Sequence, residues 1–191
     1  MAVLPILHVG HPNLRLRARE VSPEELRTEE LQRFIDDLVE TMRHANGAGL
    51  AATQVDRPLR ICAIEVKDNP RYPYKPNIPL TVLVNPVLAP QGDEQFENQE
   101  GCLSVPALRG AVKRHAVVRV TGLDRHGTTI DRVVRGISAG TFQHEVDHLD
   151  GLLFLDRVED TRTLATWDQW KAHHEAAFVE NVRAVVARHG S

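Results

Sequence analysis

Apolar residues recur at helical spacing in the N-terminal part of the chain. Ser22, Pro23 and Glu25 are typical of a helix N-terminus: a capping serine, a proline at the first helical position, and a glutamate three residues after the cap. Apolar positions three or four residues apart follow, and Asn46 and Gly47 end the pattern. The spacing predicts a helix whose buried face consists of Leu31, Phe34, Ile35, Leu38, Val39 and Met42.

β-Branched residues dominate several later segments. Segments 61–66 (ICAIEV) and 80–88 (LTVLVNPVL) predict strands. Between them, segment 71–79 (RYPYKPNIP) contains three prolines and predicts a loop. Segments 117–120 and 128–134 flank the turn sequence DRHG, which predicts a β-hairpin.

Two further helices are expected towards the C-terminal end. One covers 137–149 and ends at Gly151, and the other covers 163–188. Because helices and strands are partly segregated along the chain, the expected fold class is α+β. We expect mixed or antiparallel strands packed around a central helix at 137–149, with helices at the N- and C-terminal ends. No internal repeat or linker divides the chain, so residues 1–191 are expected to form a single domain.

Composition narrows the class of protein. The chain has 191 residues, 42% of them hydrophobic, which is enough for one core. Its formal net charge of −3 gives no basic excess that would indicate nucleic-acid binding. Its longest apolar runs are strand-sized, so no membrane span is expected, and the N-terminus lacks the pattern of a signal peptide. The two cysteines fit a reducing cytoplasm better than a disulfide scaffold, so we expect a cytoplasmic protein.

The stretch QHEVDHLDG, residues 143–151, contains the pattern HExxH. His144 and His148 are one helical turn apart, so both imidazoles lie on one face and can point a nitrogen at the same cation. Glu145 follows the first histidine and can reach a water molecule on the metal without being a ligand itself. The pattern therefore predicts a metal site that has its own catalytic base, and the other eight histidines show no such pattern.

Two histidines leave a catalytic metal one protein ligand short of the usual three. Cys62 lies among apolar residues in a predicted strand, and we interpret it as a core residue. Cys102 lies between Gly101 and Pro106, in a stretch that indicates an irregular backbone. A free surface cysteine would be liable to oxidation, so Cys102 is the better candidate to complete a Cys/His/His site.

Three stretches of the chain resemble the motifs of the peptide deformylase family. Residues 47–54 (GAGLAATQ) resemble GxGLAAxQ, residues 100–104 match EGCLS, and residues 143–151 resemble QHExDHLxG. Their order and separation are also similar to those of the family, and the resemblance covers most of the chain. The chain differs in having Ala139-Gly140 where many members have an arginine, and loop 71–79 resembles the longer insertion of organelle-type members.

The resemblance implies a hydrolase that removes the N-formyl group from the formyl-methionine at the start of newly made polypeptides and releases formate. It implies that Cys102, His144 and His148 hold one divalent metal. A hydroxide on this metal would attack the formyl carbon, and Glu145 would accept the proton of the water and then deliver it to the departing amine.

By similarity to the family, Gln54 and the backbone N–H of Leu103 would stabilise the oxyanion that forms. Gly47, Ala48 and Gly49 are expected to bind substrate, because small side chains let a peptide backbone lie close to the chain. The methionine thioether would suit an apolar pocket. Val146 and Leu149 either line that pocket or pack in the core.

One sulfur and two nitrogen ligands suit zinc, iron, cobalt or nickel. The resemblance implies Fe²⁺ in the cell, with zinc giving a weaker enzyme. The expected partner is an N-formylmethionyl peptide or nascent chain, and the ribosome surface is a further expected partner. Neither a nucleic-acid site nor a membrane contact is indicated.

Two other functions are compatible with parts of this pattern. A general HExxH metalloprotease would share the histidine helix but usually takes its third ligand from downstream, whereas Cys102 lies upstream. A binding module whose fold is stabilised by a metal would not need Glu145 for its function.

Asp147, on the expected buried helix, requires a partner, and Arg109 and Arg114 are candidates to pair with it or with Glu100.

Overall fold

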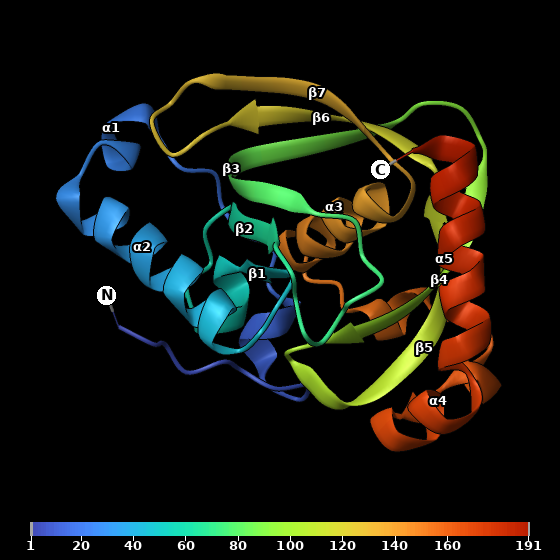
Figure 1. Ribbon diagram of the computed structural model, residues 1–191. Helices are drawn as coiled ribbons and strands as arrows, with labels where there is room; N and C mark the ends of the chain where they lie inside the picture. The colour runs from blue at the N-terminus through green and yellow to red at the C-terminus, as the bar shows by residue number, and fades with distance from the viewer. Residues whose placement is uncertain (1, 191) are drawn as a thin grey trace.

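The structure of the protein, a computed structural model, describes residues 2–190. Its strands form two sheets, with the orders β1-β2-β3-β6-β7 and β4-β5-β8 (Figure 1). Neighbouring strands in both sheets are antiparallel. The strands are β1 Gly49–Ala51, β2 Ile61–Val66, β3 Ile78–Pro90, β4 Gln95–Cys102, β5 Val105–His115, β6 Val117–Leu123, β7 Thr129–Arg135 and β8 Ala165–Thr166.

The helix that carries the two histidines lies at the centre of the molecule. It contacts strands of both sheets, and Figure 1 shows it enclosed between them, with α2 towards one side and α5 towards the other. This arrangement confirms the α+β class and the central helix expected from the sequence. The helices are α1 Pro23–Leu26, α2 Glu29–His44, α3 Gly136–Leu149, α4 Trp167–His173 and α5 Glu175–His189, with short 3-10 helices η1 Pro12–Arg15, η2 Ala52–Val55, η3 Phe154–Arg157 and η4 Thr161–Thr163.

The N-terminal helical segment consists of two helices, α1 and α2. The sequence predicted one continuous helix starting at the Ser22 cap. The Ser22 hydroxyl accepts a hydrogen bond from the Glu25 N–H and caps α1, but Thr28 forms a second cap. Its hydroxyl donates to the Glu25 carbonyl and accepts from the Leu31 N–H, so α2 begins anew at Glu29. The six apolar residues predicted for the buried face of this helix are all buried.

Strands β4 and β5 carry part of the site, and the sequence patterns did not predict them. Along β4, Phe96, Asn98, Glu100 and Cys102 alternate inwards and are buried. Because three of these four are polar or a candidate ligand, the inward face lacks the apolar alternation by which a strand is recognised. The irregular backbone expected around Cys102 is present, since the register between β4 and β5 shifts between Gly101 and Cys102.

The C-terminal segment is two helices, and the prediction of a single helix over 163–188 was wrong. Residues Ala165–Thr166 pair with β5 as β8, and the helical path breaks at His174, between α4 and α5. The break lets Trp170 of α4 and Phe178 of α5 enter the same apolar cluster, with ring centroids 5.8 Å apart. Tertiary packing therefore overrides the helical continuity of the sequence.

The other predictions from periodicity are confirmed. Strand β2 has the predicted bounds, β3 extends the predicted strand at both ends, and β6 and β7 form the predicted hairpin. Segment 71–77 is a loop, as its prolines indicated, and its last two predicted residues already belong to β3. Within residues 2–190, the structure has no helix that combines the length and apolar character of a membrane span.

Candidate metal centre and active site

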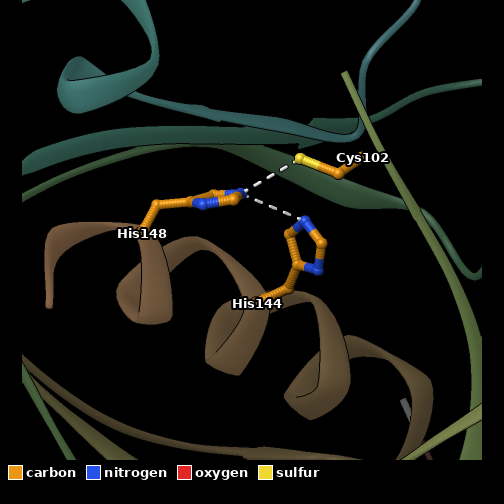
Figure 2. A group of neighbouring side chains, drawn as sticks. All are labelled: Cys102, His144 and His148. Carbon is orange, nitrogen blue, oxygen red and sulfur yellow. Dashed lines mark hydrogen bonds between the residues drawn. The ribbon is translucent and has the colours of Figure 1, made fainter. Parts of the chain in front are cut away.

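Three side chains from two distant segments converge at the centre of the molecule. Cys102 lies at the end of β4, and His144 and His148 lie one turn apart on α3 (Figure 2). The Cys102 sulfur is 3.3 Å from His148 Nε2, which is 3.3 Å from His144 Nε2. Among the described residues, this is the one group of three such side chains whose ligand atoms all lie within 4.8 Å of one another.

The Nδ1 atom of each imidazole lies within hydrogen-bond distance of an oxygen acceptor. His144 Nδ1 is 2.8 Å from Glu100 Oε2, and His148 Nδ1 is 3.1 Å from the Leu152 carbonyl oxygen. A neutral imidazole that donates from Nδ1 to such acceptors carries its lone pair on Nε2. In this tautomer both Nε2 atoms direct their lone pairs towards each other and the Cys102 sulfur, an arrangement that a metal cation bound between them would stabilise.

The donor set fits a divalent metal ion. Burial opposes ionisation of the Cys102 thiol, but His148 and His144 outweigh burial and hold the pKa of the thiol well below its ordinary value. A thiolate with two imidazole nitrogens is a ligand set typical of zinc and related transition metals. Cys62 does not belong to this site, because it lies fully buried within β2, where burial raises the pKa of its thiol.

Glu145 lines the same pocket as the three candidate ligands. Burial raises the pKa of its carboxyl, and the neighbouring imidazoles partly offset this effect. Its Oε2 is buried and, within the described chain, without a hydrogen-bond partner. A buried carboxylate oxygen left in this state is available to bind a proton of an incoming water molecule or substrate.

Gly49 in β1 makes room for this carboxylate. A Cβ at this position would lie 2.3 Å from Glu145 Oε1 and 2.4 Å from its Cδ. Such distances are impossible for non-bonded atoms, so any larger residue would displace Glu145. Gly49 of the first motif is therefore required because it lies in close contact with Glu145 of the third motif.

Gln54 also lies at the metal centre. Its amide Nε2 donates to Ser104 Oγ at 3.0 Å and to the Cys102 sulfur at 3.4 Å, and its Oε1 accepts from the Ala51 N–H. Leu103 occupies the turn directly after Cys102 and lines the pocket. The structure thus brings Gln54 and Leu103 to the side of the site where Cys102 lies.

A buried ion-pair network ties the ligand helix to both long strands of the smaller sheet. Arg114 of β5 donates to both oxygens of Glu100 on β4 at 2.8 Å, and to Asp147 of α3 at 2.6 Å. Arg157 also pairs with Asp147. The expected pairing of Arg114 and Asp147 is confirmed, and the Arg114 guanidinium outweighs burial to hold the pKa of Glu100 well below its ordinary value.

Arg109 does not take part in this network, so its expected pairing with Glu100 or Asp147 was wrong. Its guanidinium is fully buried and stacks on two indole rings, 4.0 Å from the centroid of Trp170 and 4.4 Å from that of Trp167. One nitrogen donates to the Gln99 carbonyl and the Tyr74 hydroxyl. The position of Arg109 is determined by Trp167 and Trp170, which follow the third motif in the sequence and belong to none of the three motifs.

Comparison with known proteins agrees with this site. The family model described as polypeptide deformylase matches residues 3–163. The chain belongs to this family. It is 40% identical over 169 residues to peptide deformylase 2 of Nostoc sp. and 42% identical over 166 residues to peptide deformylase 1 of Nitrosomonas europaea, in each case over 93% of the relative. These matches cover 88% and 87% of this chain.

Solved structures of deformylases share the fold. The class I type b peptide deformylase of Acinetobacter baumannii, solved with Met-Ala-Ser bound, is 40% identical and superposes with a TM-score of 0.79. The match covers 82% of this chain and 99% of that one. The deformylase of Thermotoga maritima is 31% identical, with a TM-score of 0.74 over 84% of this chain and all of that one. The family and the Cys/His/His cluster together indicate a bound divalent metal.

The pocket of this deformylase-family chain differs from the apolar pocket expected from the sequence. Val146 and Leu149 do not line it: Val146 faces another part of the surface, and Leu149 packs in the core. Gly47, Ala48 and Gly49 form one wall. The lining also includes side chains that no motif indicated, namely Tyr72, Lys75, Asn98, Arg109 and Thr141.

Lys75 is the least expected of these residues, because it comes from the proline-rich loop. Burial lowers its pKa to about 8, although Glu100 and Glu145 partly oppose the effect. Its Nζ donates to Thr141 Oγ1 at 3.1 Å. Only folding brings the loop to the metal centre, so no signal within residues 71–79 could have placed Lys75 there.

Arg114→Met tests the buried network. The change leaves Glu100 and Asp147 with less compensation in a buried setting, so we expect the free energy of unfolding to fall by about 3–5 kcal/mol in chemical denaturation. Arg157→Met is the matched control: the Arg157 side chain is 45% exposed, and its loss should cost about 1 kcal/mol or less. Equal losses from the two variants would contradict this account of the network.

Proposed function

We propose that this protein hydrolyses the N-formyl group of N-formylmethionyl peptides and releases formate. The observation that carries the proposal is the position of Glu145 in the pocket of the converging Cys102, His144 and His148 side chains, with an Oε2 that has no hydrogen-bond partner among residues 2–190. Membership of the deformylase family points to the same reaction. The Met-Ala-Ser peptide bound in the Acinetobacter baumannii relative has the sequence that such a reaction would leave.

Cys102, His144 and His148 would hold the metal. When bound, a divalent metal lowers the pKa of a water molecule from 15.7 towards about 7 and so supplies a nucleophile near neutral pH. Glu145 accepts a proton as the formyl carbon is attacked and delivers it to the nitrogen of the departing amine. Its raised pKa brings the carboxyl closer to the working pH, where both proton transfers are efficient.

Gln54 and the Leu103 backbone N–H would stabilise the negative oxygen that forms on the formyl group. Gln54 Nε2 lies 3.4 Å from the Cys102 sulfur, so a small rotation can redirect one N–H from sulfur to that oxygen. The second N–H remains held by Ser104, which fixes the amide in place. Donors fixed in this way act mainly on charge that develops in the transition state.

Gly47, Ala48 and Gly49 would bind the peptide backbone, since their small side chains leave the wall of the pocket open. We propose Fe²⁺ as the metal in the cell, with Zn²⁺, Ni²⁺ and Co²⁺ also compatible with one thiolate and two imidazoles. The substrate would be a nascent chain in the cytoplasm, met at or near the ribosome surface. The chain would act as a single catalytic domain, because both sheets contribute to one site.

Formate release from formyl-Met-Ala-Ser, together with metal analysis of the same anaerobically purified sample, tests the function. Glu145→Gln should lower kcat by about 10²–10⁴ while the metal content stays unchanged, because the general base is lost and the ligands remain. Cys102→Ser should instead lower the metal content. Full turnover by Glu145→Gln would favour a metal-stapled binding module, and cleavage confined to internal peptide bonds would favour a metalloprotease.

Gly49→Ala tests the contact between the first and third motifs. The added methyl group displaces the Glu145 carboxylate, so we expect kcat to fall about 10²-fold in the formate assay. The loss should nearly vanish when Gly49→Ala is introduced into the Glu145→Gln variant, since both changes act through one carboxylate. Full additivity in this double-mutant cycle would show that Gly49 acts on something else.

A further inference from the structure

The half-buried face of β7 carries an arginine between two apolar residues. Side chains alternate along this strand, and Ile130 and Val134 pack against the apolar cluster that contains Phe142. Arg132 lies between them on the same face, with its Cζ 5.1 Å from the centroid of the Phe142 ring. A guanidinium in such a setting needs acceptors for its five N–H groups, and an aromatic face does not supply them.

Most of these N–H groups have no acceptor within residues 2–190. Arg132 Nη2 donates to Thr81 Oγ1 at 2.9 Å, and this is the one hydrogen bond of the side chain in that range. Its Nε is buried and without a partner among the same residues. The adjacent carboxylate, Asp131, belongs to the opposite face of β7 and pairs with Arg119. Burial lowers the pKa of Arg132, and no carboxylate of the described chain opposes that effect.

Arg132 lines a cavity of about 290 Å³ at the corner where β7 turns into α3. The walls of this β7–α3 cavity come from the end of the proline-rich loop, the end of β7 and the start of α3. Among the described residues, the lining includes two arginines, Arg132 and Arg135, and no acidic side chain. None of its lining residues also lines the pocket of Glu145, so the cavity is separate from the metal centre.

Ser138 provides a second, independent indication of a ligand in this cavity. The residue is only 6% exposed and lines the cavity, yet its hydroxyl has no hydrogen-bond partner within residues 2–190. One turn further along α3, the hydroxyl of Thr141 donates to the Ile137 carbonyl, which is the usual way for such a group to be satisfied in a helix. A buried hydroxyl left without a partner is costly unless a group inside the cavity accepts from it.

The start of α3 adds positive charge at the same place. Ser138 lies in the first turn of this helix of 14 residues, which has no side-chain cap and no acidic residue in that turn. Arg135, a residue that cannot accept hydrogen bonds, occupies the N-cap position. The partial positive charge of the helix end therefore lies beside two guanidinium groups. An anion in the cavity would relieve the repulsion among these three positive groups.

We propose that the β7–α3 cavity binds a phosphate group, whose oxygens accept hydrogen bonds from Arg132, Arg135 and the Ser138 hydroxyl. A phosphate group suits donors that converge from several directions, because each of its oxygens accepts hydrogen bonds. Two sources share this chemistry: inorganic phosphate and the terminal phosphate of a small phosphomonoester. The bound group would connect the proline-rich loop, β7 and α3, and would stabilise the folded state by mass action.

Calorimetric titration of the metal-loaded protein with inorganic phosphate near neutral pH tests the site. We expect saturable binding of one phosphate at the cavity, and Arg132→Met should weaken it about tenfold or more, because a charged donor is lost. Arg17→Met is the matched control, since this arginine side chain is 81% exposed and lies outside the cavity, and it should leave the affinity unchanged. A parallel titration with adenosine 5′-monophosphate identifies the source: tighter binding than that of inorganic phosphate indicates a phosphomonoester.

Ser138→Asp gives a second test with the opposite sign. The new carboxylate would lie in the first turn of α3 beside Arg132 and Arg135, where it takes the place of the bound anion. We expect Tm without phosphate to rise by about 2–4 °C and phosphate binding at the cavity to be lost. Ser138→Asn, of similar size and without charge, should not raise Tm.

Phosphate at the metal centre cannot produce these differences, because neither Arg132 nor Ser138 lines that pocket. Equal phosphate affinity in the wild type and Arg132→Met, with both proteins folded by thermal melting, would overturn the proposal. Wild-type affinity in Ser138→Asp would overturn it as well, as would the absence of saturable binding to the wild type. Formate release is independent of this site, so failure here would leave the proposed deformylase function untouched.

Discussion

The ion pairs of Arg114 with Glu100 and Asp147 are the constraint on which the rest of the structure depends. A helix that carries two candidate ligands and two carboxylates lies at the centre of the molecule, where uncompensated charge is costly. Arg114 bridges a carboxylate on β4 and one on α3. The same Glu100 carboxylate orients His144, so the network that compensates the buried charge also positions a candidate metal ligand.

This coupling explains why the inward face of β4 is mainly polar. Alternate positions of β4 face the centre, and there they supply Asn98, Glu100 and Cys102 where an ordinary strand would supply apolar side chains. Hydrogen bonds and ion pairs within the network provide partners for these polar groups, which would be costly to bury unpaired. A strand of this kind holds its functional groups more rigidly than a loop could, which suits a site that requires fixed ligand geometry.

The sequence predicted the parts of the site that lie close together along the chain. The HExxH spacing placed His144 and His148 on one helical face, and the contrast between Cys62 and Cys102 indicated which cysteine the cluster would include. Helices and strands with a clear apolar period were also predicted. Strand β4 was missed because three of its four inward positions are polar or a candidate ligand, and β5 was missed because its buried residues 109–112 form a continuous run without apolar alternation.

By itself, then, the sequence determined the residue types, their spacing and the resemblance that connects three motifs to one family. The tertiary structure decided which distant groups meet: Gly49 against Glu145, Arg114 between two carboxylates, and Lys75 in the pocket. Local spacing is encoded by the geometry of one helix or strand. Contacts between distant segments form only when several helices and strands pack together and exclude water. No single stretch of sequence specifies which side chains meet in that packing.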